Sequence, residues 1–176
     1  MITSVPMGEI RLTRETGVLR SLLGSCVGIA LYQPETRTAV LSHTLLSDST
    51  LFRPSENERS VPPGRYVDTA IDEMLRRLRV LRERPSGLLA HVAGGADMFG
   101  VESADAVGRL NCEAVIRQLS DRHIDLVSEH CGGTVARRMS IDASNGGVRI
   151  EEVETPPTAD VVNQRHRNLQ HRGAPR

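Results

Sequence analysis

A cysteine and a histidine in the first third of the chain are spaced so that they could form a nucleophile and its base. Cys26 and His43 flank a predicted hairpin whose turn covers residues 33–36, with Pro34 at the position that favours proline. With that turn, Cys26 lies directly opposite His43 on one face of the hairpin. Directly opposed side chains have Cβ atoms about 4.5–5.5 Å apart. The spacing therefore predicts a thiol within hydrogen-bond reach of an imidazole.

A thiol beside an imidazole is the usual arrangement of an activated sulfur nucleophile. An imidazolium lowers the pKa of the thiol, and the thiolate is the reactive form. The turn formed by Gly24 and Ser25 could direct the backbone N–H groups of Ser25 and Cys26 toward a developing oxyanion. The alternative is structural, because free cysteine is among the most buried residue types. A shift of the hairpin register by one residue would also separate the pair.

A glycine-rich loop over residues 94–100 is a second candidate site. It begins with Gly94 and Gly95 but lacks the lysine of a phosphate-binding loop and the glycine spacing of a dinucleotide site. We interpret it as a tight loop beside the active site. Met98 and Phe99 could form an apolar contact for a protein substrate or partner, and burial in the core is an equally good reading.

The remaining cysteines and histidines do not form a metal-binding pattern. The sequence has no Cys-x-x-Cys pair, and the neighbours His130 and Cys131 would point to opposite sides of a strand. Cys112 lies in a predicted helix, where it is interpreted as a small apolar residue, as is Cys131 in its strand. We expect neither a metal ion nor a cofactor.

Composition excludes several other classes of function. The chain of 176 residues has 22 basic and 22 acidic residues and only four aromatic residues, so it lacks the charge and the stacking surfaces of a nucleic-acid-binding protein. It contains no lysine, which excludes Schiff-base chemistry. Its apolar runs are too short for membrane insertion. An odd number of cysteines without a signal peptide indicates a reducing, cytoplasmic location.

Hydrophobic periodicity predicts short strands and two main helices. One helix covers residues 67–81 and ends before Pro85, and the other covers residues 104–119. The predicted strands cover residues 8–13, 18–23, 27–32, 38–46, 88–93, 124–129, 137–142 and 147–153. This order indicates a single α+β domain of residues 1–153. Residues 154–176, with almost no large apolar side chain, are expected to form a disordered tail.

Several segments together resemble the CheD family of chemoreceptor glutamine deamidases. The most specific is the Leu-Gly-Ser-Cys run at residues 23–26, with a histidine 17 residues after the cysteine. The Gly-Gly-Ala-x-Met-Phe loop at residues 94–99 adds to its specificity. The resemblance covers most of the chain outside the tail, in segments 21–34, 42–46, 63–70, 94–99, 108–111 and 132–137.

The resemblance carries expectations about the fold and the site. It implies a three-layer α/β sandwich with mixed or antiparallel sheets, similar to the catalytic domain of the cytotoxic necrotizing factor toxins, which are also glutamine deamidases. It implies that Cys26 is the nucleophile and His43 the general base, and that no cofactor is needed.

The third catalytic residue of the family, a threonine a few positions before the cysteine, is replaced in this chain. Ser21 is the nearest match and keeps the hydroxyl, whereas an ungapped comparison with longer versions of the motif reaches Arg20. In one continuous strand, Ser21 and Cys26 would point to opposite faces, so a bulge at Gly24 would be needed. A second departure is Ser47, where relatives usually have proline, which puts the shape of the following loop in question.

The function implied by the resemblance is the conversion of glutamine side chains to glutamate, with release of ammonia. The expected substrates are the cytoplasmic domains of chemoreceptors, in chemotaxis signalling. Two alternatives stay open: a non-catalytic module that binds a CheC-type phosphatase, and a Cys-His peptidase or amidase of other specificity.

Overall fold

Two sheets and two helices make up the described part of the chain. The computed structural model describes residues 1–50, 61–80, 87–98 and 107–153. One sheet has the strand order β1 (Ile2–Ser4), β3 (Val18–Leu23), β8 (Ala136–Asp142) and β9 (Val148–Val153). The other has the order β2 (Ile10–Arg14), β5 (Thr38–Thr44), β4 (Val27–Gln33), β6 (Leu89–Gly94) and β7 (Asp125–Cys131). The helices are α1 (Val67–Leu78) and α2 (Val107–Asp121).

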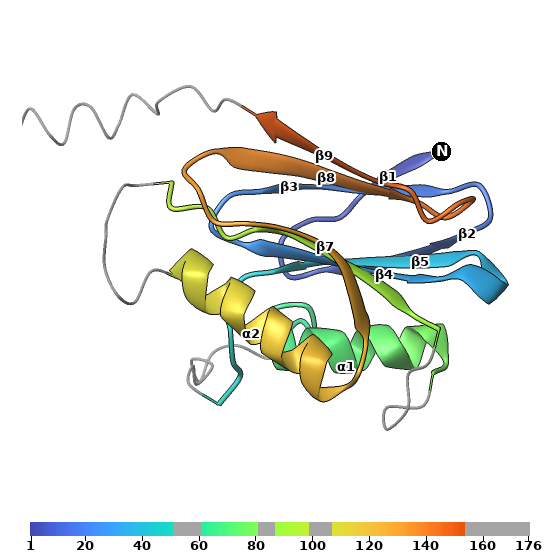
Figure 1. Cartoon of the computed structure of the whole chain (residues 1–176), viewed down its shortest axis with the longest axis horizontal. Coiled ribbons are helices and arrows are strands. Elements are labelled where there is room, and N and C mark those ends of the chain that lie inside the picture. The colour runs from blue at the N-terminus through green and yellow to red at the C-terminus, as the bar shows by residue number, and fades with distance from the viewer. Residues whose placement is uncertain (51–60, 81–86, 99–106, 154–176) are drawn as a thin grey trace, which may run out of the picture.

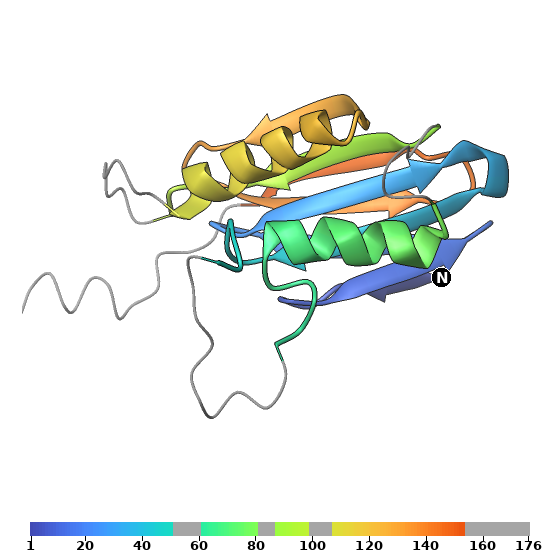
Figure 2. The same ribbon diagram turned by 90° about the horizontal axis from the view of Figure 1, so that it is seen from below.

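These elements form three layers. The four-stranded sheet lies on one face of the five-stranded sheet, and α1 and α2 cover the opposite face (Figure 1). Figure 2, the view from below, shows the two helices side by side in front of the same sheet. The pairs β1–β3 and β6–β7 are parallel and the other strand pairs are antiparallel. The predicted three-layer α+β sandwich is confirmed.

Each interface between layers has its own apolar core. The buried residues of α1 recur at intervals of three and four, so one face of the helix packs on the five-stranded sheet. The second core lies between the two sheets and includes Leu19, Leu23, Leu41 and Met139. Strand β4 is buried along almost its whole length because it contributes to both cores. An apolar run without polar relief is typical of such a strand.

The β4–β5 hairpin has a different register from the predicted one. Gly28, not Cys26, lies opposite His43. The connection contains a short 3-10 turn, Pro34–Thr36, followed by Arg37 in the left-handed conformation with φ of 44°. The inclusion of Arg37 moves the centre of the turn and shifts the pairing by two residues. An even shift keeps each side chain of β4 on its predicted face, and Cys26 lies just before the paired segment.

Other differences concern the ends of elements. The three-residue strand β1 was not predicted; it pairs in parallel with β3. The helix α1 ends at Leu78, three residues early, because Arg79 adopts a left-handed conformation with φ of 59°. The predicted tail, residues 154–176, lies outside the described residues. None of the described helices combines the length and the apolar character needed to span a membrane.

Candidate active site

Ser21 and His43 contact each other at the interface between the two sheets. Ser21 lies on β3 in the four-stranded sheet, and His43 lies on β5 in the five-stranded sheet. The distance between Ser21 Oγ and His43 Nδ1 is 2.8 Å. Both side chains are buried, with exposed fractions of 2% for Ser21 and 6% for His43. The structure therefore brings together two of the three side chains predicted for the site.

The hydrogen bonds around this pair indicate which ring nitrogen carries the proton. Ser21 Oγ donates its only proton to the carbonyl oxygen of Val5 at 2.9 Å. The same carbonyl lies 3.4 Å from His43 Nδ1 and can only accept. Nδ1 must therefore be the protonated nitrogen, donating to Ser21 Oγ and toward Val5. This leaves the lone pair of a neutral imidazole on Nε2, where it can accept a proton.

Two residues, Ser21 and Arg20, were candidates for the third catalytic position. The side chain of Ser21, and not that of Arg20, is directed between the sheets. Along β3 the buried residues are Leu19, Ser21 and Leu23, in strict alternation. The parity argument for a bulge at Gly24 was wrong, because it treated β3 and β4 as one strand of one sheet. The chain instead crosses from the four-stranded to the five-stranded sheet through residues 24–26, which belong to no strand.

Cys26 lies at the end of that crossing, immediately before β4. It is a partly buried free thiol. Because Gly28 is the strand partner of His43, Cys26 lies two residues before the position opposite His43 and outside strand β4. No hydrogen bond joins the thiol to His43 in the described part of the chain. The predicted direct opposition of Cys26 and His43 is therefore wrong.

Burial favours the neutral forms of the Cys26 thiol and the His43 imidazole. It raises the pKa of the Cys26 thiol, and it lowers the pKa of His43 despite the opposing effect of the Val5 carbonyl. The expected lowering of the thiol pKa by an imidazolium is not found. These directions favour a neutral thiol and a neutral imidazole near pH 7, and not a thiolate–imidazolium pair.

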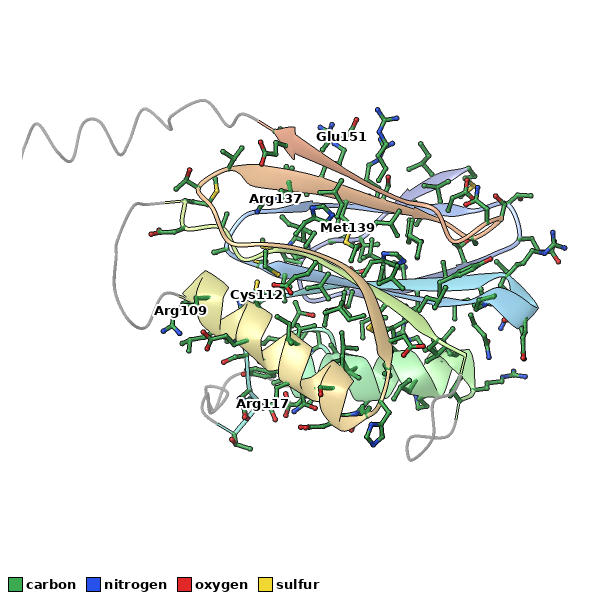
Figure 3. The ribbon with its side chains drawn as sticks, viewed as in Figure 1. Arg109, Cys112, Arg117, Arg137, Met139 and Glu151 are labelled. Atoms are coloured by element: carbon green, nitrogen blue, oxygen red, sulfur yellow. The ribbon has the colours of Figure 1, made fainter. Side chains whose placement is uncertain are left out.

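Gly28 makes room for this arrangement. A Cβ atom at residue 28 would lie 2.7 Å from Leu23 Cδ1 and 3.1 Å from Met139 Sδ. Met139 is also the strand partner of Ser21 on β8, and Figure 3 shows it between the two sheets. The absence of a side chain opposite His43 thus lets the two sheets approach closely enough for Ser21 to reach the imidazole.

The glycine-rich loop supports the segment that carries Cys26. Gly95 N–H donates to Cys26 O at 2.8 Å, and Ala96 N–H donates to Gly24 O at 2.9 Å. Gly94 has φ of +109°, and a Cβ atom there would lie 2.3 Å from Cys26 O. The predicted tight loop therefore lies against the Cys26 segment, and two of its N–H groups are already used by carbonyls of this chain.

The other predicted loop residues have different positions. Met98 is partly buried and lies over Gly24, because a Cβ atom on that glycine would be 3.3 Å from Met98 Cγ. Phe99 lies outside the described residues. The N–H groups of Ser25 and Cys26, predicted as oxyanion donors, have no protein acceptor among the described residues.

Asn111 was not singled out from the sequence, although it contacts the same segment. It is fully buried on α2, and its Nδ2 donates to Leu45 O at 2.8 Å and to Ser25 O at 3.3 Å. The signal in the sequence was a polar residue on the buried face of the helix, next to Gly108 and Cys112. Figure 3 shows Cys112 on the face of α2 that is turned toward the sheet.

The other two cysteines, Cys112 and Cys131, lie together next to the glycine-rich loop. Cys131, at the end of β7, and Cys112 interact through their thiols, and this interaction lowers the pKa of Cys112 and raises that of Cys131. Both are free thiols packed in the helix–sheet core, as predicted. No group of three or more His, Cys, Asp or Glu side chains is placed to hold a metal ion in residues 1–50, 61–80, 87–98 and 107–153.

Comparisons with known proteins connect this site to one family. A family model described as CheD chemotactic sensory transduction matches residues 45–152. The chain is 34% identical over 153 residues to a Clostridium botulinum protein named "Probable chemoreceptor glutamine deamidase CheD", covering 85% of this chain and 91% of that protein. A Thermococcus kodakarensis protein of the same name is 34% identical over 165 residues, covering 92% and 99%. The family model begins after Ser21, Cys26 and His43, whereas the alignment with the Thermococcus protein covers 92% of this chain and leaves too short a remainder to exclude these three residues.

Proposed function

Because the chain belongs to the CheD family, we propose that it deamidates glutamine side chains of chemoreceptors, with Cys26 as the nucleophile. The observation that carries the proposal is the hydrogen bond of 2.8 Å between Ser21 Oγ and His43 Nδ1. It leaves His43 Nε2 as a base on the same hairpin as the thiol. The names of the relatives supply the reaction and the substrate class.

The first half of the reaction forms a thioester. His43 Nε2 takes the proton of the Cys26 thiol as the sulfur attacks the carboxamide carbon of the glutamine side chain. The N–H groups of Ser25 and Cys26 hold the oxygen of the tetrahedral intermediate as it gains negative charge. The imidazolium then gives its proton to the nitrogen, the C–N bond breaks, and ammonia leaves.

The second half restores the enzyme. Water loses a proton to His43 Nε2 and attacks the thioester carbon, and the C–S bond breaks. The sulfur recovers its proton from His43, and the side chain leaves as glutamate. Each turnover converts one neutral amide into a carboxylate and so adds one negative charge to the receptor. The chemistry needs only a thiol, an imidazole and backbone amides, so no cofactor takes part.

Ser21 acts through His43. Its hydroxyl oxygen accepts a hydrogen bond from Nδ1–H and orients the ring, so that Nε2 is the ring nitrogen without a proton. Serine keeps the hydroxyl that the family supplies from threonine, so the same role is available. The reaction takes place in the cytoplasm, where chemoreceptors carry their signalling domains, and the three free thiols are compatible with that reducing compartment.

The experiment that tests the proposal is peptide mapping of a chemoreceptor cytoplasmic domain after incubation with the protein. We expect a mass gain of about 1 Da at individual glutamine residues, and none with Cys26→Ala. Cys131→Ala is the matched control, because it removes a partly buried thiol outside the site and should leave the gain unchanged. No gain with the wild-type protein, or a gain that survives Cys26→Ala, contradicts the proposal. Cleavage of the receptor backbone instead would indicate a peptidase.

A CheC-type phosphatase is proposed as a second partner, on the family resemblance alone. Co-purification of the two proteins and a titration of their binding would test it. Binding together with a lack of glutamine conversion would favour the non-catalytic module over the deamidase.

A further inference from the structure

The side chain of Asn111 joins the segment that carries Cys26 to the end of the strand that carries His43. Its Nδ2 donates to Leu45 O, just after β5, and to Ser25 O, just before Cys26. A side-chain amide nitrogen has two N–H donors, so these two bonds use both of them. One fully buried side chain therefore fixes the two segments relative to each other.

The carbonyl of Ser25 belongs to the same peptide group as the N–H of Cys26. A trans peptide is planar, so its N–H points away from its C=O, and the described residues contain no cis peptide. A hydrogen bond that fixes the direction of Ser25 O therefore also fixes the direction of the Cys26 N–H. Donation to the carbonyl polarises the peptide group as well and makes its N–H a stronger donor.

The carbonyls on either side are held by backbone groups. Gly24 O, in the peptide of the Ser25 N–H, accepts from Ala96 N–H, and Cys26 O accepts from Gly95 N–H. Among the described residues, Asn111 is the one side chain that donates to any of these three carbonyls. It is thus the position at which a substitution can release this peptide without altering the glycine-rich loop.

The oxygen of the Asn111 amide differs from its nitrogen, because it forms no hydrogen bond with the described residues. Asn111 Oδ1 is buried and has no hydrogen-bond partner among the described residues. An unpaired buried acceptor costs about 1–3 kcal/mol. An apolar residue would avoid that cost but would leave the carbonyls of Ser25 and Leu45 without this donor.

We propose that Asn111 is a positioning residue of the deamidase site, which directs the Cys26 N–H as an oxyanion donor and holds the Cys26 segment at the end of β5. This inference rests on the proposed function. It predicts a fall in the rate of the chemical step without a matching loss of substrate binding.

The first test compares Asn111→Leu with Val115→Ala. Leucine keeps the branched shape of the side chain and removes both donors, whereas Val115 is a fully buried residue one turn further along α2 whose side chain donates no hydrogen bond. We expect Asn111→Leu to lower kcat for receptor deamidation about 10- to 100-fold and to change KM by less than about twofold. Val115→Ala should lose thermal stability but keep its kcat. Should leucine not be accommodated, Asn111→Ala removes the same donors.

The second test does not depend on activity. In Asn111→Leu, the amide resonance of Cys26 in a ¹H–¹⁵N NMR spectrum should shift more than amides outside residues 24–26, because its peptide loses the donor to Ser25 O. It should not shift in this way in Val115→Ala. An unmoved Cys26 resonance, or a kcat equal to that of Val115→Ala, would overturn the inference. If the wild-type protein does not deamidate receptors, the proposed function fails. The Cys26 amide resonance still shows whether Asn111 fixes the orientation of the peptide group between Ser25 and Cys26.

Discussion

Ser21 and His43 belong to different sheets, and the 2.8 Å hydrogen bond between Ser21 Oγ and His43 Nδ1 crosses the core that separates those sheets. The direction of this bond follows from the Val5 carbonyl, which takes the serine proton. The tautomer of His43 is thus set by two contacts from the other side of the sandwich. In the proposed mechanism this tautomer presents Nε2 as the base.

Removal of the Ser21 hydroxyl should therefore slow deamidation. In Ser21→Ala, the Nδ1 proton keeps only the longer contact of 3.4 Å to Val5 O, so the ring is less well oriented. We expect kcat to fall about 10- to 100-fold, less than the full contribution of a general base. Initial rates of ammonia release from a receptor domain give the measurement.

Ser21→Thr is the control for this variant. It keeps the hydroxyl, and a β-branched residue suits a strand. Activity should stay within about threefold of wild type. Equal rates for Ser21→Ala and the wild-type protein would exclude a role for the hydroxyl.

The rate of Cys26 alkylation should depend on pH differently from the rate of deamidation. The pKa of the thiol is raised by burial, so alkylation by iodoacetamide should be slow at pH 7 and increase as the pH rises above about 8.5. The pKa of His43 is lowered by burial, so the base is neutral at pH 7 and deamidation should decline only below about pH 6.5. Rates of both reactions measured from pH 5 to 10 would separate the two groups.

Two variants assign the profiles. Cys26→Ala should abolish the alkylation of this position in a mass map, and His43→Gln should remove the acidic limb of the deamidation profile together with most of the rate. Rapid alkylation at pH 7 that levels off there would show a thiolate at rest, which is contrary to this prediction.

Mild acid should destabilise the fold through its buried histidines. Burial lowers the pKa of His43 and of His91, so the unfolded chain binds protons more readily than the folded chain. The stability that these residues contribute is present above about pH 6.5, and it is lost as the pH falls through that value. Urea unfolding at pH 7.5 and 5.5 should show a smaller free energy of unfolding at the lower pH.

The window between pH 7.5 and 5.5 avoids the titration of Asp48, Glu73 and Asp142, because hydrogen bonds lower the pKa of each of these carboxylates, to about 2 for Glu73. In His91→Gln, the difference in unfolding free energy between the two pH values should shrink. His123→Gln is the control, because His123 is exposed and its loss should leave the difference unchanged. A difference that His91→Gln does not alter would contradict the assignment.

A side chain at residue 94 should disrupt the segment that carries Cys26. Gly94→Ala would place a Cβ atom 2.3 Å from Cys26 O in a backbone with φ of +109°. We expect a loss of at least about 2–3 kcal/mol in the free energy of unfolding and a loss of most deamidase activity. Thermal unfolding and initial rates supply the two measurements.

Gly87→Ala is the matched control for backbone strain. Its φ is +72°, and a Cβ atom there meets no heavy atom within 4 Å. It should cost about 1–2 kcal/mol from conformation alone and leave the activity unchanged. Similar stability losses in the two variants would show that contact with Cys26 O is unimportant.

Sequence patterns predicted the layers of this protein better than its register. The apolar periodicity of residues 67–78 and the apolar run of residues 27–33 reflect burial directly, so α1 and β4 could be identified. The pairing of β4 with β5 depends on Arg37 in a left-handed conformation, which arginine has no intrinsic preference to adopt. A strand as short as β1 has too few residues for periodicity to be seen.

The candidate site shows the same limit. Cys26 and His43 were found because their residue types and spacing indicate chemistry, and the resemblance added Ser21. The contacts that Val5 and Asn111 make could not be predicted in this way. Val5 contributes a backbone carbonyl, which any residue has, and Asn111 reaches Ser25 across 86 positions of sequence. Both contacts exist only once the layers have packed.

In the proposed enzyme, the position of Ser21 and His43 on separate sheets makes catalysis depend on the packing of the sandwich core. Met139 is the strand partner of Ser21, and its sulfur packs toward Gly28, the strand partner of His43. The thickness of this apolar layer therefore determines the distance between the Ser21 hydroxyl and the His43 imidazole. In the proposed enzyme, a change in inter-sheet spacing caused by a bulkier core residue would act on the proton-transfer step, although that residue touches no reacting atom.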